Sequence, residues 1–330
     1  MKYNDVLTNF HLKYFNSYHP KRKTHICGEK NMNKVIVVGS INMDVITRVA
    51  RLPQTGETVS GYSAEYLPGG KGLNQAAACA KMGIETILAG CLGQDVFADR
   101  LYDFIKKLGI KTDYIRRCDK ESGTAFINVA ENGQNTIVVV PGSNAELSAD
   151  KIAVLPIDRG DVVICQFEIP LNTVMETFAK AKKAGATTLL NPSPIRHIPS
   201  DLLAVTDILV VNETELGFLC GKKLSEQTSA EEIAAAANNI RPQESQTIIV
   251  TLGSRGALIA GKDVYFAEGH KVNAIDTVGA GDCFAGVVAA RLLTCKDLRE
   301  CVRTANLAAS ICVTRKGAAP AMPHHDELFS

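Results

Sequence analysis

Near the end of the chain, two carboxylates bracket a run of small residues. The carboxylates are Asp276 and Asp282, and the run ends in Gly279, Ala280 and Gly281. A Gly-Ala-Gly turn at a helix start lets consecutive backbone N–H groups point at one spot, which makes an anion hole. A carboxylate in the first turn beside that hole can take a proton from an attacking hydroxyl. The alternative is an ordinary glycine turn with an acidic helix start, and the paired carboxylates favour catalysis over it.

A second polar group follows the apolar segment 207–211. There Asn212 and Glu215 enclose Glu213 and Thr214. The C-terminal ends of strands in doubly wound sheets are where ligands bind, so this pair could orient hydrated Mg²⁺ near nucleotide phosphates. The same spacing is also typical of a capping box at a helix start. On this segment alone, the cap is the favoured interpretation.

Two further segments place glycine beside polar side chains. The segment 69–74 reads Gly-Gly-Lys-Gly-Leu-Asn, in which glycines allow close approach of a ligand and Lys71 and Asn74 offer donors. The segment 39–44 ends the first apolar run, and its alternating Asn42 and Asp44 can grip vicinal hydroxyls from one side. Taken alone, each segment is better explained as an ordinary turn.

The elements that must position these residues alternate between short β-branched runs and helical stretches. Such alternation predicts βαβ units and a mostly parallel sheet with helices on both faces. Strands are expected at 34–40, 86–90, 161–166, 186–191, 207–212 and 246–253, and helices at 72–83, 95–109, 171–184, 229–240, 280–294 and 297–315.

Two stretches, 45–67 and 122–142, instead alternate apolar and polar residues around turns and predict antiparallel ribbons. A ribbon with one apolar face needs cover, so we expect a lid over a site, a dimer surface, or both. Residues 33–323 are expected to form one domain, followed by a tail at 324–330. Residues 1–32 lack sustained periodicity and are expected to be a disordered extension or to precede the natural start.

Composition narrows the classes of function. Lys plus Arg number 36 against 35 Asp plus Glu, and no run of about 18 apolar residues occurs, so neither nucleic acid nor membrane is expected as a partner. The ten cysteines contain no Cys-x-x-Cys pair, which favours buried thiols in a reducing cytoplasm over zinc or disulfides. The first strand is not followed by G-x-G-x-x-G, which disfavours a dehydrogenase. The segment 256–262 resembles a Walker A loop, but Asp263 replaces its Ser or Thr and the segment reads as a hairpin.

Taken together and in this order, the four groups of residues resemble the ribokinase-like (PfkB) family of sugar and nucleoside kinases. The resemblance covers about residues 33–323, and its signature regions are 69–74 and 276–282, with the Asn-x-x-Glu element at 212–215 between them. It implies an α/β fold: a central, mostly parallel sheet sandwiched by helices, with a small β-sheet lid that also forms a homodimer contact. The implied reaction is ATP-dependent phosphorylation of the 5-hydroxyl of D-ribose, giving D-ribose 5-phosphate.

The resemblance also implies a role for each matching residue. Asp282 would be the general base, beside an anion hole formed by Gly279, Ala280 and Gly281. Asn212 and Glu215 would be associated with Mg²⁺. The sugar would be bound by Asn42, Met43, Asp44, Gly70, Lys71, Gly72, Leu73, Asn74, Glu168 and Asp282. ATP would be bound by Asn212, Thr251, Leu252, Gly253, Ser254, Arg255, Gly256, Gly281, Asp282 and Asn306. A monovalent cation, usually K⁺, would be held by Asp276, Val278, Cys312, Arg315, Gly317 and Ala321, of which Ala321 lacks the hydroxyl that is frequent at that position.

Other functions stay open beside this one. Deoxyribose kinases share the anion hole and the magnesium motif, but they tend to place the first Asn one position earlier than Asn42, so ribose is favoured. Other sugar or nucleoside kinases of the family are further alternatives. A sensing module that has lost catalysis would show a replaced base or a broken anion hole, and Asp282, Gly279 and Gly281 are all present.

Overall fold

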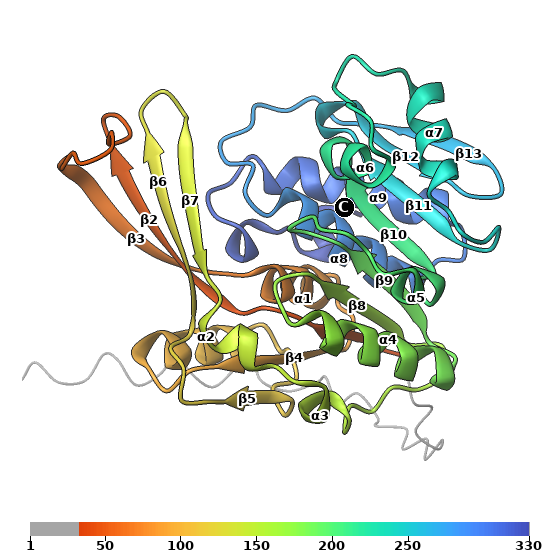
Figure 1. Cartoon of the computed structure of the whole chain (residues 1–330), viewed down its shortest axis with the longest axis horizontal. Helices are drawn as coiled ribbons and strands as arrows, with labels where there is room; N and C mark the ends of the chain where they lie inside the picture. Colours follow the sequence, from red (N-terminus) through yellow and green to blue (C-terminus); the bar gives the residue numbers. More distant parts are fainter. Residues whose placement is uncertain (1–32, 330) are drawn as a thin grey trace, which may run out of the picture. The chain divides into compact units, whose positions relative to one another are not determined.

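The computed structural model describes residues 33–329, so the predicted extension 1–32 lies outside the described part. The predicted alternation of strands and helices forms a nine-stranded sheet in the order β13-β12-β11-β10-β9-β8-β1-β4-β5 (Figure 1). All neighbouring pairs from β5 to β11 are parallel, and the pairs β11–β12 and β12–β13 are antiparallel. The strands are β1 (Val35–Val38), β4 (Thr86–Leu92), β5 (Ile115–Arg117), β8 (Val162–Gln166), β9 (Thr187–Asn191), β10 (Ile208–Asn212), β11 (Thr247–Thr251), β12 (Gly256–Ala260) and β13 (Val264–Glu268).

Helices cover both faces of this sheet because its central strands are apolar on both sides. In β1, Val35 and Val37 pack into one core, and Ile36 and Val38 pack into the other. The first core is covered by α1 (Lys71–Lys81), α2 (Val96–Lys107), α8 (Ala280–Leu292) and α9 (Leu298–Cys312). The second is covered by α3 (Ala149–Ile152), α4 (Leu171–Ala184), α5 (Ser200–Ala204), α6 (Glu213–Cys220) and α7 (Ala230–Asn239).

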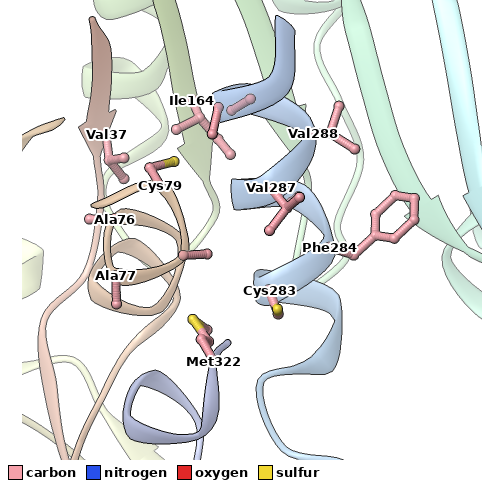
Figure 2. Packing of buried hydrophobic residues seen from close by; sticks show 14 of the residues in the cluster. Val37, Ala76, Ala77, Cys79, Ile164, Cys283, Phe284, Val287, Val288 and Met322 are labelled. Atoms are coloured by element: carbon pink, nitrogen blue, oxygen red, sulfur yellow. The ribbon is translucent and has the colours of Figure 1, made fainter. Parts of the chain in front are cut away.

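Helices α1 and α8 lie side by side over the sheet, with small side chains between them (Figure 2). The closest approach is at Gly286, where an added Cβ would lie 2.6 Å from the Gln75 carbonyl oxygen and 2.7 Å from Ala78 Cβ. The Ala-rich sequence of α1 therefore serves packing as well as helix propensity. This contact brings the N-terminal ends of both helices to the same edge of the sheet.

A second sheet of four strands has the order β3-β2-β6-β7 and extends to one side of the helix-covered body (Figure 1). Its strands are β2 (Asn42–Val49), β3 (Gly61–Gly69), β6 (Gly123–Ala130) and β7 (Asn135–Val140), and we call it the lid sheet. The predicted ribbons 45–67 and 122–142 are its two hairpins, which β2 and β6 join by parallel pairing.

One expected placement is wrong. Asn42 and Asp44 belong to the start of β2 and not to the end of the first strand. The strand is interrupted because the Asn144 side chain bonds both backbone groups of Ile41, accepting from its N–H at 2.9 Å and donating to its carbonyl at 3.3 Å. The chain therefore leaves the large sheet at Gly39 and enters the lid sheet at Asn42. Within residues 33–329, no helix has the length and apolar character needed to span a membrane.

Candidate active site

The segment 276–282 forms the loop that enters α8, as its sequence predicts. Gly279 precedes the helix at φ +78°, and an added Cβ would lie 2.5 Å from Ala318 Cβ, so only glycine fits there. No side chain caps this helix, and its first backbone N–H groups lack intrahelical partners. An added Cβ at Gly281 would meet nothing within 4 Å. The Ala280 N–H donates to Thr277 at 3.3 Å, which leaves the neighbouring amides of the turn to face an anion.

Asp282 is buried in the first turn of α8 and lies against α1. Its Oδ2 accepts from Asn74 Nδ2 at 2.9 Å, its Oδ1 accepts from Gln75 Nε2 at 3.1 Å, and Lys71 Nζ lies 4.0 Å from Oδ1. Asp282 borders a cavity of about 210 Å³ at the C-terminal ends of the parallel strands. The cavity is lined by Lys71, Asn191, Ser193, Val210, Val211, Asn212, Glu215, Thr251, Gly279, Gly281 and Asp282.

Glu168, just beyond the end of β8, joins the two glycine-containing segments. Its Oε2 accepts from Ser40 Oγ at 2.5 Å, from the Lys71 backbone N–H at 3.2 Å and from Asn42 Nδ2 at 3.5 Å. Asn144 in turn donates to Asn42 Oδ1 at 2.6 Å. Among the sugar-site side chains expected from sequence, hydrogen bonds link Asn42 to Glu168 and Asn74 to Asp282. Two others are the apolar Met43 and Leu73. Those two are buried in the core, so only their backbone can face a ligand.

Electrostatics in this region are dominated by carboxylates. Burial raises the pKa of Asp44 to about 7, and Glu168, Asp282 and Asp276 add to the rise. For Lys71, burial would lower the pKa, but the carboxylates of Asp282, Glu168 and Glu215 outweigh it and raise the pKa above its usual value. Lys71 is therefore a permanent cation in a site with excess negative charge, which suits a ligand that is neutral and rich in hydroxyls.

Asn212 and Glu215 form the capping box that their spacing suggests, and they also line the cavity. Asn212 Oδ1 accepts from the Glu215 N–H at 2.8 Å, and Glu215 Oε2 accepts from the Asn212 N–H at 2.9 Å. The two interpretations of this motif are thus compatible. The cap fixes one carboxylate oxygen of Glu215, and its other oxygen stays available to a ligand.

The predicted nucleotide segment 251–256 runs from the end of β11 to the start of β12. Thr251 lines the cavity, and Gly253 and Gly256 adopt φ values of +57° and +113°. Arg255 is held by Glu213 at 2.5 Å and by the Thr228 carbonyl at 2.9 Å. Asn306 lies outside the cavity lining, donating to the carbonyls of Ala267 and Glu268 at 3.2 and 3.3 Å.

The residues of the predicted monovalent-cation site come from two loops that Asp276 links. Its Oδ1 accepts from the Val278 N–H and its Oδ2 from the Gly317 N–H, each at 3.0 Å. Among the described residues, no loop or side-chain hydrogen bond reaches the carbonyl oxygens of Val278, Arg315 or Gly317. The Ala321 carbonyl accepts from Arg315 Nη1 at 3.4 Å, and the Cys312 carbonyl accepts from the Arg315 N–H at 3.0 Å.

Sequence reasoning did not assign roles to several side chains that hold this site together. They are Ser40, Gln75, Asn144, Gln166 and Asn191, all of them buried. Three of them carried a usable signal: Ser40 and Gln75 lie within or beside the glycine-containing segments, and Gln166 stands two residues before Glu168. Asn144 and Asn191 carry none, because only the folded chain brings them to the site.

Comparison with known proteins agrees with this geometry. Residues 32–325 match the family model described as pfkB family carbohydrate kinase. The chain is 37% identical to the ribokinase of Staphylococcus aureus (strain COL), over 90% of this chain and 98% of that protein. It is 34% identical to the deoxyribokinase of Salmonella typhi, over 89% of this chain and 97% of that protein.

Solved structures show the same fold. The ribokinase of Thermotoga maritima superposes with a TM-score of 0.82 at 33% identity, covering 90% of this chain and 98% of that one. The Arabidopsis thaliana ribokinase, solved in complex with ribose and ATP, superposes with a TM-score of 0.79 at 32% identity, covering 90% and 97%. A family match over most of the chain, relatives above 30% identity and this shared fold lead to one conclusion: the chain belongs to the pfkB family of carbohydrate kinases.

Proposed function

We propose that this protein is a ribokinase, which transfers the γ-phosphoryl group of ATP to the 5-hydroxyl of D-ribose. The observation that carries the proposal is the buried Asp282 carboxylate, which borders a polar cavity at the uncapped N-terminus of α8. A carboxylate so placed serves as proton acceptor, and the amide groups beside it stabilise negative charge. The similarity to ribokinases over nearly the whole described chain supports ribose as the acceptor.

In the proposed reaction, the phosphoryl group passes from ATP to the sugar, and the hydroxyl proton passes to the protein. Asp282 accepts the proton of the 5-hydroxyl as that oxygen forms its bond to the γ-phosphorus, and the bond from phosphorus to the ADP oxygen breaks. The amides of the turn at Gly279 and Gly281 would face the charge on the transferring group, while the Ala280 N–H is engaged by the Thr277 carbonyl. Stabilising this charge is the main contribution a protein makes to phosphoryl transfer. Thr251 lines the cavity, and we expect the nucleotide to extend from it along Thr251–Gly256 toward Asn306.

The sugar is expected against the polar side chains of β2 and α1. Asn74 Oδ1 is buried and has no hydrogen-bond partner among the described residues, so it is an acceptor waiting for a hydroxyl donor. Lys71 supplies a charged donor from the same segment, and Asn42, Asp44 and Glu168 complete the set together with the backbone at Gly70 and Gly72. This donor and acceptor pattern suits the adjacent hydroxyls of a pentose.

The two predicted cations fit the residues present. Among residues 33–329, no cluster of acidic, His or Cys side chains could hold a metal by itself, which agrees with a Mg²⁺ bound mainly through nucleotide phosphates and water, with Asn212 and Glu215 nearby. The Mg²⁺ would neutralise phosphate charge. The carbonyl oxygens around Asp276 that carry no loop or side-chain hydrogen bond suit a K⁺ site, where Val278, Arg315 and Gly317 would be ligands, joined by Cys312 and Ala321.

The lid sheet supports a homodimer. Every residue of β7 is exposed, although four of its six residues are Ile or Val, and such an apolar edge strand needs a partner. The cysteines among the described residues are all free, which supports the reducing, cytoplasmic location expected from the sequence.

The test is ADP release with MgATP and KCl against D-ribose, 2-deoxy-D-ribose, D-fructose and adenosine in parallel. Highest kcat/KM for ribose is expected. Highest kcat/KM for deoxyribose would keep the mechanism and reassign the acceptor, and no turnover with any of them would reject the proposal.

Asp282→Asn is the matching variant. It keeps the size of the side chain but removes the proton acceptor, so we expect kcat to fall by at least about 10³-fold while ribose binding, measured by calorimetry, changes little. Normal turnover in this variant would remove Asp282 from the role of base.

A further inference from the structure

Behind the proposed base lies a chain of buried amides that no step of the reaction uses directly. We infer that Gln75, oriented by Gln166, is a positioning residue that holds the Asp282 carboxylate ready to accept the proton. The inference rests on the function proposed above and names residues of the same site. Both glutamine side chains are fully buried, so neither touches solvent and neither borders the cavity.

Every hydrogen-bonding group of the Gln75 amide has a partner. Its Nε2 donates to Asp282 Oδ1 at 3.1 Å and to Asn191 Oδ1 at 3.2 Å, and its Oε1 accepts from Gln166 Nε2 at 2.5 Å. Asn191 in turn donates from its Nδ2 to the Val210 carbonyl at 3.0 Å. Because each donor and acceptor group of this buried amide has a partner, only one orientation of the amide satisfies all of the hydrogen bonds.

Gln166 and the Asp282 carboxylate together determine that orientation. Because the Gln166 Nε2 must meet an oxygen, the Gln75 Oε1 points toward Gln166 and the Gln75 NH₂ group points toward Asp282. A flipped Gln75 would place an oxygen against the carboxylate, which is repulsive. The Gln166 Oε1 has no hydrogen-bond partner among the described residues and packs against Gly39, where an added Cβ would lie 2.1 Å from it.

The backbone explains how Gln75 reaches the base. Gly286 in α8 allows α1 to approach so closely that an added Cβ would lie 2.6 Å from the Gln75 carbonyl oxygen. Cys79 Sγ, one turn further along α1, donates to the Gly286 carbonyl at 3.1 Å and fixes the same contact. Consecutive residues Asn74 and Gln75 then reach the two oxygens of one carboxylate.

The two side chains that donate hydrogen bonds to Asp282 differ in their other contacts. Asn74 Nδ2 donates to Oδ2, but its Oδ1 has no partner among the described residues, so a hydroxyl of the sugar proposed to bind Asn74 would compete for this side chain. Gln75 contacts only protein groups. It is therefore the donor that stays in place through substrate binding and keeps the plane of the carboxylate fixed, and misorientation of a reacting group is costly in rate.

The first experiment compares steady-state kinetics of wild type and Gln75→Met, which keeps the length of the side chain and removes its hydrogen bonds. We expect kcat to fall about 10- to 100-fold while KM for ribose and for ATP stays within about twofold. The matched control is Gln246→Met, which removes a similarly buried amide that bonds the Leu203 and Thr206 carbonyls and the Gln243 N–H, none of which lines the cavity. It should lower stability and leave kcat unchanged. An unchanged kcat in Gln75→Met, or an equal loss in the control, would overturn the inference.

A double-variant cycle tests the role of Gln166. If Gln166 acts only through Gln75, Gln166→Met lowers kcat in the wild-type background but has no further effect once Gln75→Met is present. Additive losses in kcat would contradict the proposed order of action.

A substrate-free measurement separates this inference from the proposed function. Urea unfolding of Gln75→Met, Asp282→Ala and the double variant reports the contact between the two side chains. The midpoint shift caused by Gln75→Met should be larger in wild type than in the Asp282→Ala background. Equal shifts would reject the contact whatever the acceptor is, whereas coupling in an enzyme inactive on ribose would reject the acceptor alone.

Discussion

Asp44 is a carboxylate of the candidate site whose pKa is raised by its surroundings. It is buried beside Glu168, Asp282 and Asp276, and its pKa rises from 3.8 to about 7. The folded state therefore binds more protons than the unfolded state between about pH 4 and pH 7. The free energy of unfolding falls as pH rises through that window, and the full cost, roughly 4 kcal/mol as an upper bound, is present above pH 7.

Asp44→Asn removes this cost, because an amide does not ionise. We expect the variant to raise the Tm relative to wild type at pH 8 and to change it little at pH 4, while ribose affinity falls because an acceptor for a hydroxyl is lost. Thermal unfolding at both pH values checks the sign, with Asp263→Asn at an exposed position as control. A Tm difference independent of pH would show that Asp44 ionises normally in the folded protein.

At this scale, the sequence predicts residues that share a short motif and misses those that depend on distant contacts. Asn74, Lys71 and Asp282 could be named because the signature segments contain them. Their supports could not be, because Gln75 meets Asp282 across 207 positions and Asn144 meets Asn42 across 102. Met43 and Leu73 show the converse case: they lie inside the motifs, but alternation along β2 and the turn of α1 place their side chains in the core, so only their backbone can face a ligand.

Among the elements, α1 connects the two proposed ligand sites. Its first turn carries Lys71 and Asn74, and its last residue, Lys81, donates to the carbonyls of Ala319, Pro320 and Met322 at 3.2, 3.0 and 2.7 Å. Those carbonyls belong to or flank the short 3₁₀ turn Ala319–Ala321, next to Gly317 of the proposed K⁺ loop. The ammonium of Lys81 therefore ties the loop to the helix that presents the sugar site.

Lys81→Met should loosen this loop without removing any proposed K⁺ ligand. We expect the KCl concentration for half-maximal activity to rise by about tenfold, which corresponds to about 1.4 kcal/mol of lost loop order. Activity is measured against KCl at saturating ribose and MgATP. Lys81→Arg should restore much of the response, and Lys183→Met, at an exposed lysine of α4, is the control. A K⁺ response identical to wild type would mean that the loop does not need this tether.

Element prediction succeeds where the pattern is local. The hydrophobic periods give α4 with its observed bounds and β8 and β10 to within one residue. The three-residue strand β5 was not expected, because it is too short to show a period. The parallel pairing of β2 with β6 was not expected either, since it joins two hairpins far apart in sequence and depends on the path of the chain around Ile41.

For the whole molecule, the position of the site follows from topology. From β1 the chain first adds β4 and β5 on one side and later adds β8 to β11 on the other. Ligands in open α/β sheets bind where the strand order reverses, at the C-terminal ends of the strands. Ser40, Glu168, Asn191, Asn212 and Thr251 follow or end strands at that edge, and the lid sheet begins there at Asn42.

The hydrophobic core of the lid sheet is too small to account for all of the apolar residues in its strands. The hydrophobic cluster of the lid sheet itself contains three buried residues, Ile46, Ala125 and Ile127. On the other face, cross-strand pairing aligns Tyr66, Val45, Phe126 and Val138 in one row. Phe126 and Val138 in that row are 47% and 61% exposed, and Ile137 on the opposite face of β7 is 51% exposed. An edge strand that is apolar on both faces is best explained by a second copy of the chain.

Charges on β7 should therefore dissociate the proposed dimer. Ile137→Lys/Val138→Lys places a cation on each face of the strand without touching a buried residue, so the variant should fold and sediment as a monomer where wild type sediments as a dimer. The matched control is Val264→Lys/Phe266→Lys on β13, an edge strand of the large sheet with similarly exposed side chains, which should stay dimeric. Sedimentation velocity distinguishes the species.

A monomeric wild type, or dissociation by the β13 variant alone, would place the apolar lid face in some role other than self-association. If the lid variant is monomeric and its KM for ribose also rises, the partner copy also stabilises the lid sheet over the sugar, since β2 carries both Asn42 and Asp44 at its start.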